Sequence, residues 1–178
     1  MKIAITGHTA GIGKALSQEY ASQGHEIVGL STRDGHNIRN IPKIAAIIEP
    51  CDMFVNNAQA GFAQTELLFE MCRRWTNTNK PIMVISTMMT MAPVSVIAGA
   101  DEYYIQKQTL EQACTQLRYQ QHNITVVKPG AIATQPGQTI PPYADVTQWA
   151  KTLVEIFELA KRRNLIVPEI SLGPPYDS

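Results

Sequence analysis

The sequence lacks most of the features that assign a chain to a specialised class of protein. It has three cysteines, an odd number with no C-x-x-C pair, which favours a reduced, cytoplasmic setting. Its four histidines are scattered without an H-E-x-x-H pair, so no metal site is expected. Lysine plus arginine equal aspartate plus glutamate at 15 each, and this balance argues against nucleic acid or an anionic membrane as the main partner.

Long apolar stretches are also missing. No run approaches the length of a membrane span, and the strand-like start at Met1 is interrupted by Gly7 too early for a signal peptide. There is no internal repeat and no low-complexity segment. The composition is that of an ordinary globular protein, with 44% hydrophobic and 17% charged residues. The length of 178 residues predicts a single domain over residues 1–178.

Short apolar runs alternate with stretches of helical period along the chain. The expected helices carry end signals, with Gly24 after the first and Asp145 before the last. Because strands that alternate with helices form right-handed crossovers, the pattern predicts a doubly wound α/β fold around a parallel sheet. Ligands of such a fold bind at the carboxyl ends of the strands. Strands are expected at 3–6, 26–31, 53–56, 82–86, 124–128 and 165–170, and helices at 12–23, 42–49, 62–76, 99–121 and 146–160.

A glycine-rich loop lies between the first expected strand and the first expected helix. Its sequence is Thr6-Gly7-His8-Thr9-Ala10-Gly11-Ile12-Gly13. Glycine lets the backbone turn sharply and approach a phosphate without a Cβ, and the helix N-terminus offers N–H groups and partial positive charge to an anion. The alternative is a turn without a ligand. The position of the loop favours binding of a dinucleotide pyrophosphate.

A tyrosine and a lysine lie one helical turn apart past the middle of the chain. Tyr103 and Lys107 share a helix face and can point into one cleft. A phenol has a pKa of about 10, and a neighbouring ammonium is expected to lower it. Tyr103 could then exchange a proton with a carbonyl or alcohol oxygen. The alternatives are an amphipathic surface helix, or Tyr104 as the reactive phenol, although Tyr104 has Gln108 and no lysine at the matching position.

Together with three further motifs, these features resemble the short-chain dehydrogenase/reductase family. The loop has the family's form T-G-x-x-x-G-x-G, and residues 103–107 match its Y-x-x-x-K. The resemblance implies a Rossmann-like, three-layer α/β/α fold and an NAD(P)-dependent oxidoreductase that interconverts a carbonyl and an alcohol by hydride transfer. It also implies a small-molecule substrate and a homodimer or homotetramer. The other matches are Asn56-Asn57-Ala58-Gln59 with N-N-A-G, Ser86-Thr87 with a serine pair, and Pro129-Gly130 plus Thr134 with P-G-x-x-x-T.

The resemblance further implies roles for individual residues. Tyr103 and Lys107 would be catalytic, and the lysine would also hold the nicotinamide ribose. Thr87 aligns with the catalytic serine of the family, and Ser86 remains the alternative source of the hydroxyl. The residues expected to bind the cofactor are Gly7, His8, Thr9, Gly11, Ile12, Gly13, Thr32, Arg33, Asn37, Asn57, Ala58, Tyr103, Lys107, Pro129, Ile132 and Thr134.

The end of the second expected strand bears on the choice of cofactor. An acidic residue there binds the ribose 2′-hydroxyl of NAD, whereas an arginine accommodates the 2′-phosphate of NADP. Arg33 offers a bidentate fork to a phosphate, and Ser31 and Thr32 add hydroxyl groups. Asp34 follows at once and weakens this pattern. NADP is expected, with NAD as the alternative.

The chain is shorter than the family pattern in three places. Only residues 35–40 separate the second strand from the next helix, so one βα unit is expected to be lost or shortened, leaving six strands. The family's additional catalytic asparagine has no clear counterpart, because Asn77 lies too close to a strand. Residues 135–143 replace a longer substrate lid. These losses lead to a second hypothesis, that the chain is a catalytically reduced NADP-binding sensor or structural subunit. A third hypothesis, an enzyme acting on nucleotide sugars, fits the short C-terminal region poorly.

Overall fold

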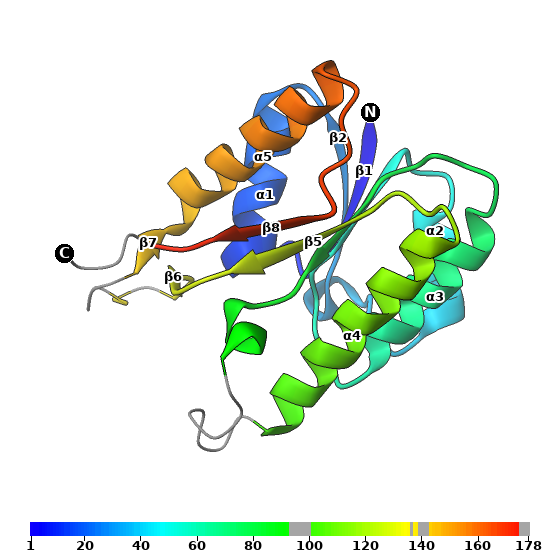
Figure 1. The fold of residues 1–178 in the computed structure, drawn as a ribbon, viewed down its shortest axis with the longest axis horizontal. Helices are drawn as coiled ribbons and strands as arrows, with labels where there is room; N and C mark the ends of the chain where they lie inside the picture. The colour runs from blue at the N-terminus through cyan, green and yellow to red at the C-terminus, as the bar shows by residue number, and fades with distance from the viewer. Residues whose placement is uncertain (93–100, 136, 139–142, 175–178) are drawn as a thin grey trace.

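The computed structural model describes residues 1–92, 101–135, 137–138 and 143–174. Its centre is a six-stranded sheet in the order β2-β1-β3-β4-β5-β8, in which every neighbouring pair is parallel (Figure 1). The predicted parallel sheet of six strands is confirmed. The strands are β1 (Lys2–Thr6), β2 (Glu26–Leu30), β3 (Met53–Asn56), β4 (Ile82–Ile85), β5 (Ile124–Pro129) and β8 (Glu169–Leu172).

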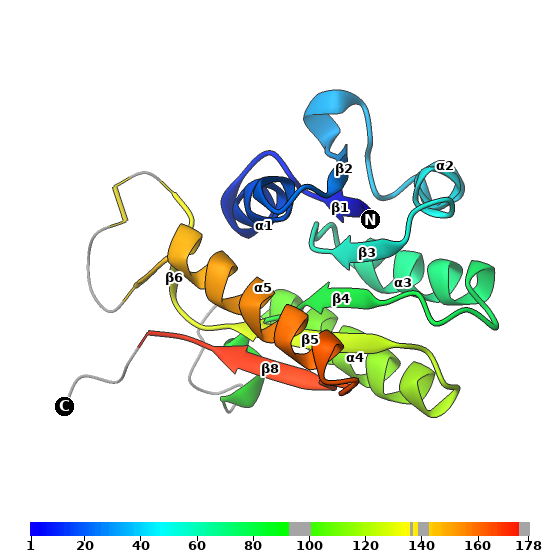
Figure 2. The same ribbon diagram turned by 90° about the horizontal axis from the view of Figure 1, so that it is seen from above.

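Helices cover both faces of the sheet. Figure 2 shows α1 and α5 on one face and α2, α3 and α4 on the other. Strands β3, β4 and β5 are buried along their whole length, which explains their unbroken apolar runs. The predicted three-layer α/β/α architecture is therefore confirmed. The helices are α1 (Gly11–Ser22), α2 (Ile41–Ile48), α3 (Ala63–Arg74), α4 (Asp101–Tyr119) and α5 (Val146–Arg162).

The strand order reverses at β1. The chain adds β2 on one side of β1 and then adds β3, β4, β5 and β8 on the other. Such a reversal opens a crevice at the carboxyl ends of the two strands where the order changes, here β1 and β3. Only a 3₁₀ helix, η1 (Thr32–Asp34), and α2 lie between β2 and β3, which confirms the expected loss of one βα unit.

The structure corrects the predicted start of the last strand and contains small elements that were not predicted. The last strand begins at Glu169, later than the predicted 165, because Leu165 and Ile166 are exposed and precede the sheet. A short parallel pair, β6 (Ile132–Ala133) and β7 (Ala144–Asp145), and a 3₁₀ helix, η2 (Met88–Met91), were not predicted, since such short segments carry no periodicity. Residues 99–100 of the expected long helix lie outside the described residues.

Helix ends follow the expected signals. Asp145 caps α5 by accepting a hydrogen bond from the Gln148 N–H at 2.8 Å, and Gly24 follows α1 with a φ of +82°. All three cysteines are buried and free. Within the described ranges, no helix is both long and apolar enough to cross a membrane, and no group of three acidic, histidine or cysteine side chains could hold a metal ion.

Candidate active site

The glycine loop joins β1 to α1 at the strand reversal. Gly7 and Gly11 have φ values of +72° and +50°, in the left-handed region that favours glycine. A Cβ on Gly13 would collide with the carbonyl oxygen of Gly7, so only glycine allows the helix to start this close to the strand. The N-cap residue Ala10 has no side-chain acceptor, which leaves the N–H groups of the first turn available to an anion.

Asn57 and Ala58 support this loop from β3. Their backbone N–H groups both donate to Thr6 Oγ1 at 3.0 Å, and the Asn57 side-chain amide donates to the Thr6 carbonyl at 2.9 Å. The same amide nitrogen would lie 2.6 Å from a Cβ on Gly13. The structure thus places Asn57 and Ala58 beneath the glycine loop, where they fix its shape.

The end of β2 brings together the residues expected to choose between NAD and NADP. Ser31 Oγ donates to Asp34 Oδ2 at 2.6 Å, and His8 Nε2 lies 3.6 Å from the same oxygen. The Asp34 carboxylate is therefore turned toward Ser31 and His8, while Thr32 and Arg33 are exposed. The His8 ring packs over Gly29, and its Nδ1 atom is buried without a hydrogen-bond partner among the described residues.

Residues from the second half of the chain approach the loop from the other side. The Thr134 side chain lies against Gly11, where an added Cβ would be 3.3 Å from Thr134 Cβ. Pro129 ends β5 and Ile132 is buried in β6.

The remaining expected cofactor residues lie in the first half of the chain. Asn37 is exposed on the loop after η1, where its Oδ1 accepts from the Arg39 N–H at 2.9 Å. Thr9 and Ile12 are half-buried within the loop itself.

Lys107 is buried at the carboxyl edge of the sheet, with 3% of its surface exposed. Its Nζ donates to Gln64 Oε1 and to the Ile85 carbonyl, both at 2.9 Å, and lies 5.6 Å from the centroid of the Tyr103 ring. These contacts are all uncharged. Burial lowers the pKa of Lys107 to about 8, and the negative charge of Glu111 acts in the opposite direction.

Tyr103 corrects one expectation. Burial raises the pKa of Tyr103, and the nearby Thr87 side chain acts in the opposite direction. The predicted lowering of the pKa of Tyr103 by Lys107 is therefore wrong for this structure, because the ammonium faces the ring and is not paired with the hydroxyl. Tyr103 remains a protonated phenol at neutral pH.

The two candidate hydroxyls point to different partners. Ser86 Oγ donates to Glu111 Oε1 at 2.5 Å. Thr87 Oγ1 accepts from the Met89 N–H at 3.2 Å and lies beside Tyr103. Of the two hydroxyls, that of Thr87 is therefore the one beside the phenol.

Tyr104, the rival phenol, packs in the structure. Only 6% of its surface is exposed, and its hydroxyl donates to the Ala92 carbonyl at 3.3 Å. The same hydroxyl accepts from Gln108 Nε2 at 2.8 Å. Its hydrogen-bonding capacity is therefore used within α4 and the segment after η2.

Gln64 is a site residue that the sequence reasoning missed. It lies in the first turn of α3 with 2% exposure, and its amide donates to the carbonyls of Asn56 at 2.8 Å and Ile85 at 3.0 Å. Its Oε1 accepts from Lys107. The signal in the sequence is a polar amide at a core-facing position of an otherwise apolar helix face.

Neither a family model nor a curated protein matches the sequence, but solved structures match the fold. A short-chain dehydrogenase from Streptomyces avermitilis shares 16% identity over 97% of this chain and 88% of that chain, with a TM-score of 0.76. An alcohol dehydrogenase from the archaeon Thermococcus sibiricus, complexed with 5-hydroxy-NADP, shares 16% identity over 99% and 97% of the two chains, also with a TM-score of 0.76. A short-chain dehydrogenase from Burkholderia cenocepacia in complex with NADP reaches 0.72 at 15% identity over 97% and 87%.

These structures define the class to which the fold belongs. The chain has the fold of the short-chain dehydrogenases, and the resemblance carried by its motifs is confirmed at the level of the fold. The similar structures include complexes with NADP and, in a 4-hydroxyisoleucine dehydrogenase, with NADH.

Proposed function

We propose that the chain is an NADP-dependent short-chain oxidoreductase that interconverts a carbonyl and an alcohol. The observation that carries the proposal is the cluster of Tyr103, Lys107 and Thr87 at the sheet edge that also holds the glycine loop. A dinucleotide supplies the hydride acceptor or donor when bound. The substrate class is small carbonyl compounds and their alcohols.

Tyr103 acts as the acid and base of this reaction. Because burial raises its pKa, the phenol is protonated at neutral pH and can give its proton to a carbonyl oxygen during reduction. The Thr87 hydroxyl lies beside it and polarises the same oxygen. Lys107, held by Gln64 and the Ile85 carbonyl, places a positive charge over the ring and stabilises the phenolate left behind.

The residues present fit a dinucleotide. Gly7 and Gly13 let the loop pack closely on the Asn57 amide, where a Cβ would clash, and the first turn of α1 offers N–H groups to the pyrophosphate. Arg33 is exposed directly after the end of β2, where a 2′-phosphate would bind. Since Ser31 and His8 engage Asp34, its charge opposes a phosphate less than the sequence suggests. NADP is therefore preferred, and NAD is the alternative. Pro129, Ile132 and Thr134 would border the nicotinamide.

The test is hydride transfer measured with NADPH and NADH over a panel of ketones, aldehydes and alcohols. Tyr103→Phe should lower kcat by about 10²- to 10⁴-fold, because it removes the proton donor. Tyr104→Phe is the matched control and should retain activity, since the hydroxyl of Tyr104 bonds only to Ala92 and Gln108. Equal activity of Tyr103→Phe and the wild type would refute the mechanism.

The sensor or structural-subunit hypothesis differs in its outcome. It predicts that NADPH binds and raises the melting temperature while no substrate is turned over. The direct contact of Gln64 with Lys107 favours the enzyme, because Gln64 offers a side-chain amide although the family's additional asparagine has no counterpart in the sequence. Thermal stabilisation by neither NADPH nor NADH would contradict both hypotheses.

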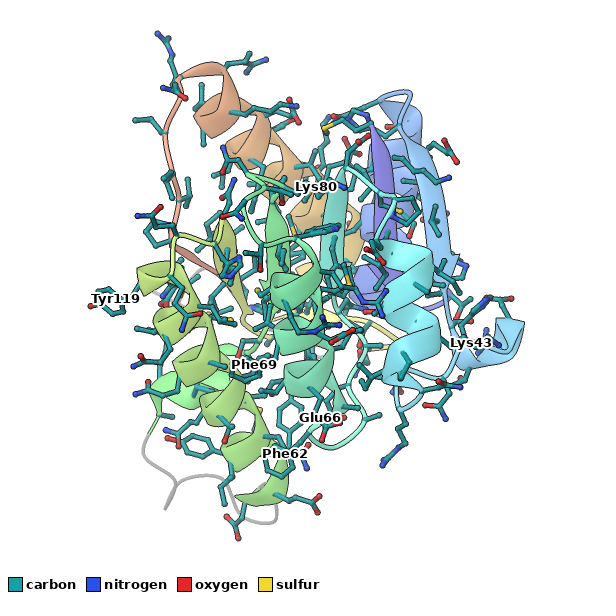
Figure 3. The ribbon with its side chains drawn as sticks, turned by 90° about the vertical axis from the view of Figure 1, so that its right-hand side faces the viewer. Lys43, Phe62, Glu66, Phe69, Lys80 and Tyr119 are labelled. Atoms are coloured by element: carbon teal, nitrogen blue, oxygen red, sulfur yellow. The ribbon has the colours of Figure 1, made fainter. Side chains whose placement is uncertain are left out.

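A homodimer or homotetramer remains part of the proposal. Figure 3 shows Phe62 and Phe69 on the side of the molecule formed by α3 and α4, and they are 45% and 49% exposed. Exposed aromatic side chains seven residues apart, about two turns along one helix, suit a helix-mediated contact between copies. Sedimentation velocity of the wild type and of Phe69→Ser would test this.

A further inference from the structure

Glu111 lies on α4 one turn beyond Lys107 and is engaged by three side chains. Its Oε1 accepts from Ser86 Oγ at 2.5 Å and lies 2.8 Å from Thr90 Oγ1. Its Oε2 lies 3.0 Å from Lys128 Nζ. One carboxylate thus joins α4 to the end of β4, to η2 and to β5.

The two hydroxyls that Glu111 holds lie on either side of Thr87 in the chain. Ser86 precedes Thr87, and Thr90 follows it within η2. Thr90 Oγ1 also lies 2.8 Å from the Thr87 carbonyl oxygen, so its proton is shared between that carbonyl and Glu111. The segment that carries the Thr87 hydroxyl is therefore anchored at both ends to a single side chain.

Glu111 belongs to the same helix as Tyr103 and Lys107. A rigid helix that carries both the phenol and the anchor of the Thr87 segment fixes the distance between the two reacting hydroxyls. The Met89 N–H donates to Thr87 Oγ1, which leaves the proton of that hydroxyl free to face the phenol or a substrate oxygen.

We propose that Glu111 is a positioning residue that holds the Thr87 hydroxyl against Tyr103, and that Ser86 serves this anchor and does not touch the substrate. The inference rests on the proposed function, since it assigns Thr87 the catalytic hydroxyl. A purely structural salt bridge is the competing interpretation. It would require only the charge of Glu111 opposite Lys128, whereas positioning requires an oxygen that accepts from the two hydroxyls.

Three substitutions separate these interpretations. Glu111→Ala removes the acceptor and should lower kcat about 10- to 100-fold, because it frees the Thr87 segment, while the KM for the cofactor stays unchanged. Glu111→Gln keeps an oxygen for Ser86 and Thr90 but loses the charge, and it should retain most of the wild-type kcat. Glu169→Gln, which touches Lys128 but neither hydroxyl, should leave kcat unchanged.

A double variant tests the same proposal if Glu111→Ala fails to fold. Ser86→Ala with Thr90→Val removes both hydroxyls and keeps the ion pair between Glu111 and Lys128. The positioning role predicts that the double variant loses kcat to the same extent as Glu111→Ala. Wild-type kcat in this variant, or an equal loss in Glu111→Gln and Glu111→Ala, would overturn the proposal in favour of the salt bridge.

A measurement without turnover keeps this inference separate from the proposed function. The pKa of Tyr103, followed by NMR of 13C-labelled tyrosine, should rise further when Thr87 moves away, in Glu111→Ala and in the double variant but not in Glu169→Gln. No change in either variant would refute the positioning role. If the wild type turns over no substrate but the NMR changes appear as expected, only the proposed function is refuted.

Discussion

Lys107 and Lys128 are both buried at the carboxyl edge of the same sheet, but their surroundings differ. Lys107, with 3% exposure, contacts an amide oxygen, a backbone carbonyl and an aromatic ring. Lys128, with 9% exposure, lies 3.0 Å from Glu111 and 3.1 Å from Glu169. Burial lowers the pKa of Lys107 to about 8. Burial also opposes the charge of Lys128, but hydrogen bonds with Glu111 and Glu169 outweigh it and raise its pKa.

Under the proposed function, Lys107 is the functional lysine and Lys128 is a structural one. A buried ammonium without a carboxylate partner is destabilised and changes protonation within the working pH range. A buried ammonium between two carboxylates stays charged, and removing either side leaves an unpaired charge. Both regions meet at Glu111, whose carboxylate pairs with Lys128 and whose field reaches Lys107.

Replacing Lys107 by methionine should mainly lower activity, whereas replacing Lys128 by methionine should mainly lower stability. Lys107→Met should lower kcat by about 10²- to 10⁴-fold because the charge over Tyr103 is lost. Lys128→Met should lower the free energy of unfolding by about 3 kcal/mol because Glu111 and Glu169 lose their partner. Steady-state kinetics and urea denaturation at pH 7 measure the two effects. A larger loss of stability in Lys107→Met than in Lys128→Met would contradict the division of roles.

The lowered pKa of Lys107 makes stability depend on pH. Between pH 8 and 10.5 the unfolded lysine binds a proton that the folded one has released, so stability rises with pH across this window and is lost as pH falls through about 8. The full effect is on the order of 3 kcal/mol. Gln64, the Ile85 carbonyl, the Tyr103 ring and Glu111 face this group.

The measurement is a difference between two proteins. Urea denaturation of the wild type and of Lys107→Met at pH 7 and pH 10 cancels the contributions of other groups, such as Cys72 and Cys114, whose pKa values burial raises to about 12. The wild type should gain stability relative to the variant at the higher pH. A constant difference would show that Lys107 is not desolvated.

Removing both carboxylates should give Lys128 the surroundings of Lys107. In Glu111→Gln with Glu169→Gln, burial is no longer compensated, and the pKa of Lys128 should fall below its ordinary value. NMR of 15N-labelled lysine side chains reports the titration. Lys107→Met in the same background assigns the second signal. A pKa of Lys128 that stays raised would show that something other than the two carboxylates holds its proton.

The sequence predicted the parts of the fold and site that depend on local pattern. The alternation of strands and helices, the glycine loop and the shared face of Tyr103 and Lys107 follow from spacing along the chain. The contacts of Gln64 with Lys107 and of Glu111 with Ser86 do not, because they join residues from different elements. The direction of the Tyr103 pKa shift depends on burial, which spacing cannot supply.

The final strand shows the same limit. Residues 165–170 are apolar enough to suggest a strand, but Leu165 and Ile166 are exposed, by 64% and 76%, and pairing with β5 begins only at Glu169. Thr125 Oγ1 donates to the Val167 carbonyl at 2.6 Å and so helps to fix where the chain joins the sheet. Hydrophobicity alone does not distinguish an apolar linker from the strand that follows it.

The smallest effect should come from Glu169, the outer partner of Lys128. Its side chain is 45% exposed, so solvent screens its ion pair, and Glu169→Gln should lower the free energy of unfolding by less than about 1 kcal/mol. Raising the salt concentration should reduce this difference further, whereas the larger cost of Lys128→Met should change little, because Glu111 is only 18% exposed. Urea denaturation in low and high salt measures both. A Glu169→Gln cost equal to that of Lys128→Met would mean that the outer carboxylate, and not Glu111, carries the pairing of Lys128.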